Sequence, residues 1–84
     1  MTRLLYFAWV KEKTGIASED VELPEGAGTV ADVIAWLNTR GPEFENAFAQ
    51  EETIRAAVDQ THARSDASVT GAKEIDFFPP VTGG

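Results

Sequence analysis

The stretch Thr29-Val30-Ala31-Asp32-Val33-Ile34-Ala35-Trp36-Leu37 is the clearest helical signal in this chain of 84 residues. Thr29 has the side chain of an N-cap residue, and Asp32 follows three positions later, where a capping-box acid belongs. The apolar residues fall at positions i, i+3, i+4 and i+7, which predicts a single helical stripe made of Val30, Val33, Ile34 and Leu37. Gly41-Pro42 is typical of a helix end. We therefore expect one amphipathic helix that packs its apolar stripe against a sheet.

Two strands are expected before this helix. Arg3 to Lys11 is rich in aliphatic and aromatic residues and contains no breaker, which predicts a strand with two apolar faces. Alternation would turn one set of its side chains toward the core: Leu4, Tyr6, Ala8 and Val10. Val21 and Leu23 alternate with acids and predict a second strand that Pro24 ends. Lys11 to Gly15 is expected to be a turn, so the two strands should pair as an antiparallel hairpin.

The second half of the chain predicts a short helix and further strands. Phe44 and Phe48 lie four residues apart, which favours a short helix that packs two rings on the core. The alternation from Ile54 to Val58 predicts a third strand. Asp59 to Ser68 is polar and is either a loop or a short irregular strand, after which Val69 should return to the core. In the last strand, Glu74 to Phe78, alternation separates Ile75 and Phe77 from Asp76 and Phe78.

This order of elements predicts an α+β fold in which a mixed sheet packs on one main helix. A β-grasp topology fits it best. We expect residues 1–78 to form one domain and residues 79–84 to form an extended C-terminal tail, because the chain is too short for a second core.

Composition excludes several classes of function. The net charge of −7, from 14 acidic and seven basic residues, argues against nucleic acid as a partner and favours a basic protein surface. The chain has no cysteine, so a disulfide framework, a cysteine nucleophile and a thiolate metal site are excluded. No apolar run reaches the roughly 20 residues of a membrane span. We expect a cytoplasmic protein with no signal peptide and no partner membrane.

The C-terminal tail is the most unusual stretch. Pro79 and Pro80 each restrict φ to about −65° and lack an amide hydrogen, so the chain should leave the last strand stiff and extended. Gly83 and Gly84 then carry no side chains, which would let a narrow channel close around the backbone. Such a tail is suited to placing its own carboxylate inside the active site of another protein.

The remaining polar residues do not form a catalytic or metal-binding pattern. Gly26-Ala27-Gly28 lacks the lysine of a P-loop and is interpreted as a loop. His62 lies in a polar stretch and is expected on the surface. The acidic pairs Glu19-Asp20 and Glu51-Glu52 are adjacent in sequence, so we interpret them as solvated charge. We predict no bound metal and no stably bound cofactor.

The ending Phe77-Phe78-Pro79-Pro80-Val81-Thr82-Gly83-Gly84 resembles that of the small, sulfur-carrying subunit of molybdopterin synthase, a ubiquitin-like protein family. The resemblance extends over nearly the whole chain and includes Leu4-Leu5-Tyr6-Phe7-Ala8 and Ala56-Ala57-Val58-Asp59-Gln60-Thr61. Asp59 stands where the family typically has asparagine. His62 occupies a position that is apolar in some relatives.

The resemblance implies a function for Gly84. An adenylating enzyme similar to ubiquitin-activating enzymes would use ATP to activate the Gly84 carboxylate. A sulfur donor protein would then convert it to a thiocarboxylate. Val81, Thr82 and Gly83 would thread into the large synthase subunit, where the sulfur reaches a cyclic pterin phosphate to build the dithiolene. The chain would be no enzyme by itself, and two copies would bind a dimer of the large subunit.

A docking surface is expected at the root of the tail. If Phe7 and Phe78 lie on adjacent strands with their side chains on the face away from the helix, they form an exposed apolar patch. Pro79, Pro80 and, by the resemblance, His62 would belong to the same partner interface.

Three alternatives remain open from the sequence. The chain could carry sulfur for another pathway, such as synthesis of the thiamin thiazole. It could modify proteins through an isopeptide bond from Gly84, or it could be a non-covalent binding domain whose tail has no role.

Overall fold

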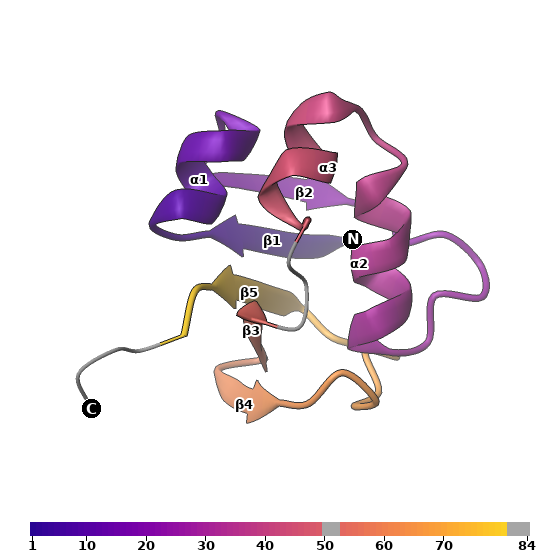
Figure 1. The fold of residues 1–84 in the computed structure, drawn as a ribbon. Coiled ribbons are helices and arrows are strands. Elements are labelled where there is room, and N and C mark those ends of the chain that lie inside the picture. The colour runs from indigo at the N-terminus through magenta and orange to yellow at the C-terminus, as the bar shows by residue number, and fades with distance from the viewer. Residues whose placement is uncertain (50–52, 81–84) are drawn as a thin grey trace.

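The computed structural model describes residues 1–49 and 53–80. Its framework is a five-stranded mixed sheet of order β2-β1-β5-β3-β4 (Figure 1). β1 (Thr2–Tyr6) and β5 (Glu74–Phe78) run parallel near its centre. Antiparallel pairs extend the sheet on both sides through β2 (Ser18–Val21), β3 (Arg55–Val58) and β4 (Thr61–Ala63). The predicted α+β class with a mixed sheet is confirmed.

The main helix, α2 (Val30–Asn38), begins as predicted. The Thr29 hydroxyl accepts a hydrogen bond from the Asp32 amide, and an Asp32 carboxylate oxygen accepts one from the Thr29 amide, both at 3.2 Å. This reciprocal capping box satisfies donors that the first turn of a helix leaves without partners. The stripe that faces the sheet is buried, as expected, and consists of Val30, Val33, Ile34 and Leu37.

The predicted short helix is α3 (Pro42–Ala47), and it buries Phe44 and Phe48. Gly41-Pro42 does not end α2, whose C-cap is Thr39. Gly41 is instead the N-cap of α3 with a φ of 139°, and Pro42 occupies the first turn. Proline is favoured there because its missing amide hydrogen costs the first turn nothing. Gly-Pro is compatible with either end of a helix. The sequence after Gly41-Pro42 therefore decides whether this dipeptide ends α2 or begins α3.

The prediction of a strand from Arg3 to Lys11 was wrong beyond Tyr6. Ala8 adopts a φ of 52°, which ends the extended conformation, and α1 (Trp9–Thr14) follows in place of the expected turn. Val10 is buried as predicted, but it reaches the core from a helix together with Thr14, one turn later. Gly15 ends α1 in the left-handed conformation with a φ of 82°. β1 and β2 still pair antiparallel, with this helix between them.

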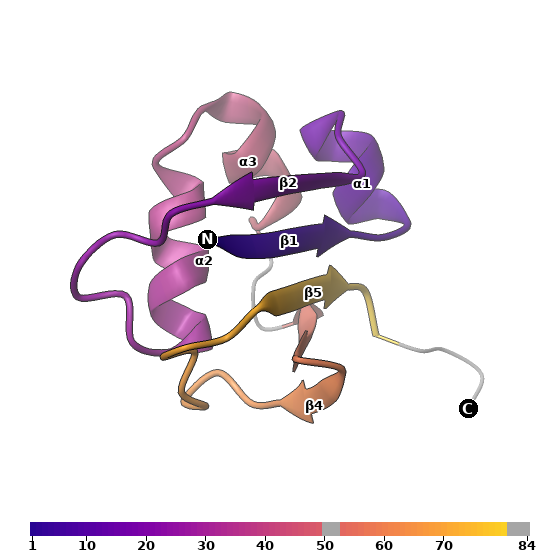
Figure 2. The same ribbon diagram turned by 180° about the vertical axis from the view of Figure 1, so that it is seen from behind.

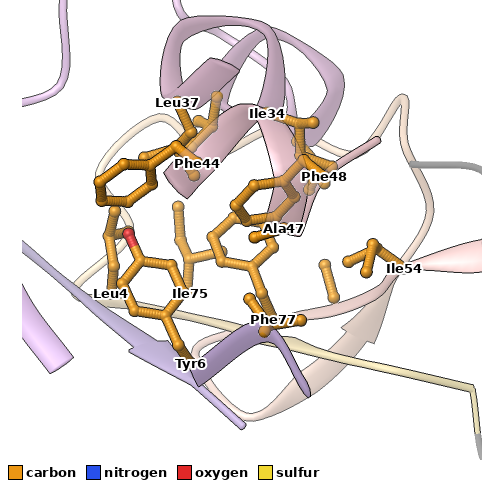
Figure 3. Packing of buried hydrophobic residues seen from close by; sticks show 14 of the residues in the cluster. Leu4, Tyr6, Ile34, Leu37, Phe44, Ala47, Phe48, Ile54, Ile75 and Phe77 are labelled. Carbon is orange, nitrogen blue, oxygen red and sulfur yellow. The ribbon is translucent and has the colours of Figure 1, made fainter. Parts of the chain in front are cut away.

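The centre of the core is a cluster of four aromatic rings (Figure 3). Tyr6 stacks on Phe77 with ring centroids 6.1 Å apart, and Phe48 meets Phe77 edge to face at 5.4 Å. Phe44 and Phe48 both approach Tyr6 edge-on. Such pairs add about 0.5–1.5 kcal/mol each beyond the burial of their area. The cluster therefore joins α3 directly to the two central strands.

Glu19 forms an ion pair with Arg40 that belongs to the fold, whereas we predicted that it would be solvated charge. One of its oxygens accepts hydrogen bonds from the Tyr6 hydroxyl at 2.7 Å and from Arg40 at 2.6 Å. Burial opposes ionisation of this carboxyl, but the hydrogen bonds from Arg40 and Tyr6 outweigh it, and the pKa of Glu19 is lowered. Glu19 thus connects β2 to β1 and to the segment after α2.

The polar segment after β3 is ordered by Asp59. Asp59 and Gln60 have φ values of 49° and 69° and form the two-residue turn between β3 and β4, where positive φ at both positions matches the twist of the strands. One Asp59 carboxylate oxygen accepts hydrogen bonds from the amides of Lys73 and Glu74, at 2.9 and 3.0 Å. Val69 is buried, as predicted. The turn between β3 and β4 therefore sets the start of β5.

Substitution of a buried and of an exposed phenylalanine tests how much the aromatic core contributes to the free energy of unfolding. Phe77 is fully buried and Phe7 is 46% exposed. We expect Phe77→Ala to lower the free energy of unfolding by about 3–5 kcal/mol, a large share of the roughly 4–13 kcal/mol of a domain of this size. Phe7→Ala should cost less than about 1 kcal/mol. Urea unfolding of both variants checks this, and equal losses would contradict the assigned core.

Candidate functional site

The candidate site is the end of the sheet from which the tail leaves. β1 and β5 are parallel neighbours, so their C-terminal ends lie side by side (Figures 1 and 2). Phe7, just beyond β1, donates its amide hydrogen to the carbonyl oxygen of Phe77 at 3.1 Å. This contact places an exposed phenylalanine beside the last two residues of β5. The chain then continues into Pro79 and Pro80, which are both partly buried.

The face of the sheet opposite α2 and α3 is the second part of the site. Figure 2 shows the strands in front of these helices. The registers of the strand pairs place ten side chains on this side, which we call the open face: Arg3, Leu5, Ser18, Asp20, Arg55, Ala57, His62, Glu74, Asp76 and Phe78. Ala57 is buried, whereas the other nine are partly or fully exposed.

Phe78 and His62 form an aromatic pair on the open face. Their ring centroids lie 5.7 Å apart and their planes are nearly perpendicular. His62 is exposed, as the sequence predicted, and it lies on the edge strand β4. The five residues predicted for the partner interface thus lie near the end of β5: Phe7, His62, Phe78, Pro79 and Pro80. Phe78 is on the open face, whereas Phe7 lies beyond the end of β1 and belongs to no strand.

The sequence analysis did not include Trp9 in the predicted partner interface. Trp9 begins α1 and is 37% exposed, and the Lys13 ammonium lies 6.0 Å from the centroid of its ring. Phe7, Ala8 and Trp9 are therefore three exposed residues at the turn from β1 into α1. The spacing of Val10 and Thr14 before Gly15 is a helical signal that could have revealed this turn.

Asp76 is the unusual charged group of the open face. One of its carboxylate oxygens is buried, and no hydrogen-bond donor in the described part of the chain reaches it. Burial, followed by a shared hydrogen bond with Glu74 and the negative charge of Glu74, raises the pKa of Asp76 to about 6. The sequence placed Asp76 on the same side as Phe78 but did not single it out.

A hollow of about 540 Å³ borders this region along β4. Its lining includes three residues that can carry positive charge, in a chain that is acidic as a whole, and consists of Ile54, Arg55, His62, Ala63, Arg64 and Ser65. Its lining holds no carboxylate.

Other predictions concern groups that the structure does not bring together or does not describe. Across residues 1–49 and 53–80, no three His, Cys, Asp or Glu side chains are grouped as a metal site would require. None of the helices described is long and apolar enough to cross a membrane. Val81, Thr82, Gly83, Gly84 and the pair Glu51-Glu52 lie outside the described residues.

This architecture, a mixed sheet with parallel central strands and one main helix packed on it, is that of the β-grasp, ubiquitin-like proteins. The model of the ThiS family matches residues 4–84. The chain belongs to the ThiS family.

Two curated relatives match the whole chain and are themselves covered completely. It is 31% identical to the molybdopterin synthase sulfur carrier subunit of Haemophilus influenzae and 32% identical to that of Escherichia coli, each over 84 residues. The predicted family resemblance is confirmed.

Solved structures support the fold. SAMP1 from Haloferax volcanii has a TM-score of 0.73 at 25% identity, with 99% of this chain and 98% of that one covered. A putative molybdopterin converting factor, subunit 1, from Pyrococcus furiosus has a TM-score of 0.73 at 27% identity, with 95% and 97% covered. The predicted β-grasp fold is confirmed.

The pKa of Asp76 predicts an unusual response to pH. Its value in the folded protein, about 6, is above its ordinary value of 3.8, so the unfolded chain loses this proton at lower pH than the folded one does. Stability from this group is therefore lost as pH rises from about 4 to about 6. Asp76→Asn should raise the midpoint of thermal unfolding at about pH 7.5, and this gain should shrink toward about pH 4. Calorimetry across this range checks it, and a gain independent of pH would contradict the assignment.

Proposed function

We propose that this chain is the sulfur carrier subunit of molybdopterin synthase and that its Gly84 carboxylate becomes a thiocarboxylate. The observation that carries the proposal is the match, over all 84 residues, to two curated sulfur carrier subunits of that enzyme. The ThiS family match, which extends to Gly84, supports a sulfur carrier of this kind.

The chemistry of the C-terminus requires an activating enzyme. A free α-carboxyl group has a pKa of about 3.3–3.7, so it is an anion at neutral pH and a poor electrophile. In the proposal, an adenylating enzyme joins it to AMP, with release of pyrophosphate from ATP, and sulfide supplied by a sulfur donor protein displaces AMP. The resulting thiocarboxylate sulfur is the nucleophile delivered to the cyclic pterin. This use of ATP fits the cytoplasm, which we propose as the compartment.

The catalytic residues are assigned to the partner. We assign no catalytic role to a described side chain of this chain and propose no stable cofactor. General acids, general bases and the pterin pocket would belong to the large subunit. This chain would contribute the sulfur and its delivery and would be no enzyme alone. We propose an assembly of two carriers on a dimer of the large subunit.

Delivery of the sulfur would use the site at the end of β5. Phe7, Phe78, Pro79, Pro80 and His62 would contact the large subunit, while Val81, Thr82 and Gly83 thread toward its active site. The exposure of Phe7 and the position of Phe78 at the end of the open face support this role. Aromatic side chains at such positions commonly contribute much of the binding energy. The activating enzyme would use the same surface, so the two partners should exclude each other.

The second candidate function is attachment to other proteins. The likeness to SAMP1 favours it, since another similar solved structure, also from Haloferax volcanii, is that of small archaeal modifier protein 1. A modifier would also be activated at Gly84, but its product would be an isopeptide bond to lysine. A carrier for thiamin thiazole synthesis would share the activation chemistry and differ in the acceptor of the sulfur.

The mass of the chain separates a carrier from a modifier. Incubation with the adenylating enzyme, ATP and a sulfur source should increase the intact mass by about 16 Da, because one oxygen of the Gly84 carboxylate is replaced by sulfur. A variant with one residue added after Gly84 should gain no mass and should support no sulfuration of the pterin. Omission of ATP is the matched control.

Either of two results would overturn the carrier proposal. One is covalent conjugates without a thiocarboxylate form. The other is full activity of the extended variant without trimming.

A further inference from the structure

We propose that Asp76 on the open face is the point at which the partner is recognised, and that it receives a lysine or arginine side chain of the large synthase subunit. This inference rests on the function proposed above and adds the chemistry of the partner surface. It makes Asp76 a specificity-determining contact at the root of the tail. Three observations support it: the position of Asp76 in the sheet, the charges of the open face, and a buried Asp76 oxygen that has no hydrogen-bond donor in the described part of the chain.

Asp76 lies in the middle of the open face. Its partners in register are Leu5 on β1 and Ala57 on β3, and the next strands outward place Ser18 and His62 in the same row. It is therefore surrounded by strands on both sides. A protein that docked on this face would cover Asp76.

The position of Asp76 also connects it to the tail. Phe78 follows two residues later on the same face, and Pro79 comes next. A partner that holds Phe78 and receives the tail lies directly beside Asp76. The open face is thus continuous with the surface proposed for delivery.

The buried carboxylate oxygen of Asp76 lacks a donor in the described part of the chain. The nearby charged groups do not supply one. On β1, Arg3 pairs with Asp20 at 3.1 Å. On β3, Arg55 lies opposite Phe78, one row toward the tail, and on β4 the ring of His62 packs edge-on to Phe78. An oxygen without a donor makes the ionised carboxylate costly in the free chain. Asp76 as a whole is partly exposed, so a cation from a partner could bind the carboxylate from the open face and offset that cost.

The remaining neighbour of Asp76 is another acid. Glu74 lies two residues earlier on the same face, and the chain as a whole carries a charge of −7. A lysine or arginine from the partner can bind a carboxylate with a charge-assisted hydrogen bond. A neutral donor would leave the repulsion between the two acids in place. Charge complementarity therefore selects a cationic side chain as the occupant.

The test compares two variants that each remove one negative charge. Asp76→Asn keeps the shape of the side chain. Glu25→Gln is the matched control, because Glu25 is exposed in the loop between β2 and α2, which Figure 1 shows away from the end of β5. Calorimetric titration of the wild type and both variants with the purified large subunit gives the Kd values at about 0.1 M salt. Circular dichroism and thermal unfolding confirm that each variant is folded.

We expect Asp76→Asn to raise Kd about tenfold or more, whereas Glu25→Gln should change it less than about threefold, because an exposed charge acts mainly through screened long-range attraction. The ratio between wild type and Asp76→Asn should also shrink when the titration is repeated near pH 5.5, since Asp76 then takes up a proton. A neutral group that merely filled space would show no such change with pH.

Three results would overturn the inference, and they have different meanings. If the wild type does not bind the large subunit, the proposed function fails as well. If the wild type binds but Asp76→Asn matches Glu25→Gln or binds more tightly, the docking is apolar and only the inference fails. If the chain alone forms a dimer that Asp76→Asn dissociates in sedimentation experiments, the occupant of the open face is a second copy.

Discussion

The parallel pairing of β1 with β5 is the constraint on which the rest of the structure depends. It joins the first strand of the chain to the last one at the centre of the sheet. Tyr6 and Phe77 are thereby stacked in the core, and the helices α2 and α3 close over them (Figure 3). The same pairing brings Phe7 to the point where the chain leaves for the tail. The pairing of β1 with β5 therefore both packs the core and positions the start of the C-terminal segment.

Two carboxyl groups show how the two faces of this sheet differ. Glu19 points toward the helix side, where Tyr6 and Arg40 donate to it and lower its pKa. Asp76 points to the open face, where burial, followed by the hydrogen bond and the negative charge of Glu74, raises its pKa. The first group stabilises the domain alone. Asp76 lowers the stability of the free domain and becomes favourable only when another molecule supplies a cation. This is expected of a residue that serves binding at the expense of stability.

The chain resembles both molybdopterin synthase sulfur carrier subunits and SAMP1, which is consistent with this arrangement. The parts that make a tail deliverable are the central strand pair, the prolines after it and the glycines at its end. None of them depends on the fate of the carboxyl group once it has been activated. Under the proposed function, the acceptor of the sulfur would therefore be set by the partner and by the surface that it binds, where Asp76 and His62 lie.

The sequence by itself determined the elements whose signals are local. The capping box of α2, the i, i+4 pair of α3 and the alternation of β5 follow from hydrogen bonds and periodicities within a few residues. The terminal glycines, on which the proposed chemistry depends, are also a feature of the sequence alone. Tertiary structure decided three other matters. Trp9–Thr14 became a helix because Ala8 turns the chain so that Val10 and Thr14 can reach the core. Glu19 forms an ion pair because the fold brings Arg40, which is distant in sequence, beside it. One oxygen of Asp76 lacks a donor in the described part of the chain because the neighbouring strands place the apolar side chains of Leu5 and Ala57 beside it. No local pattern reports which side chains adjacent strands bring into register.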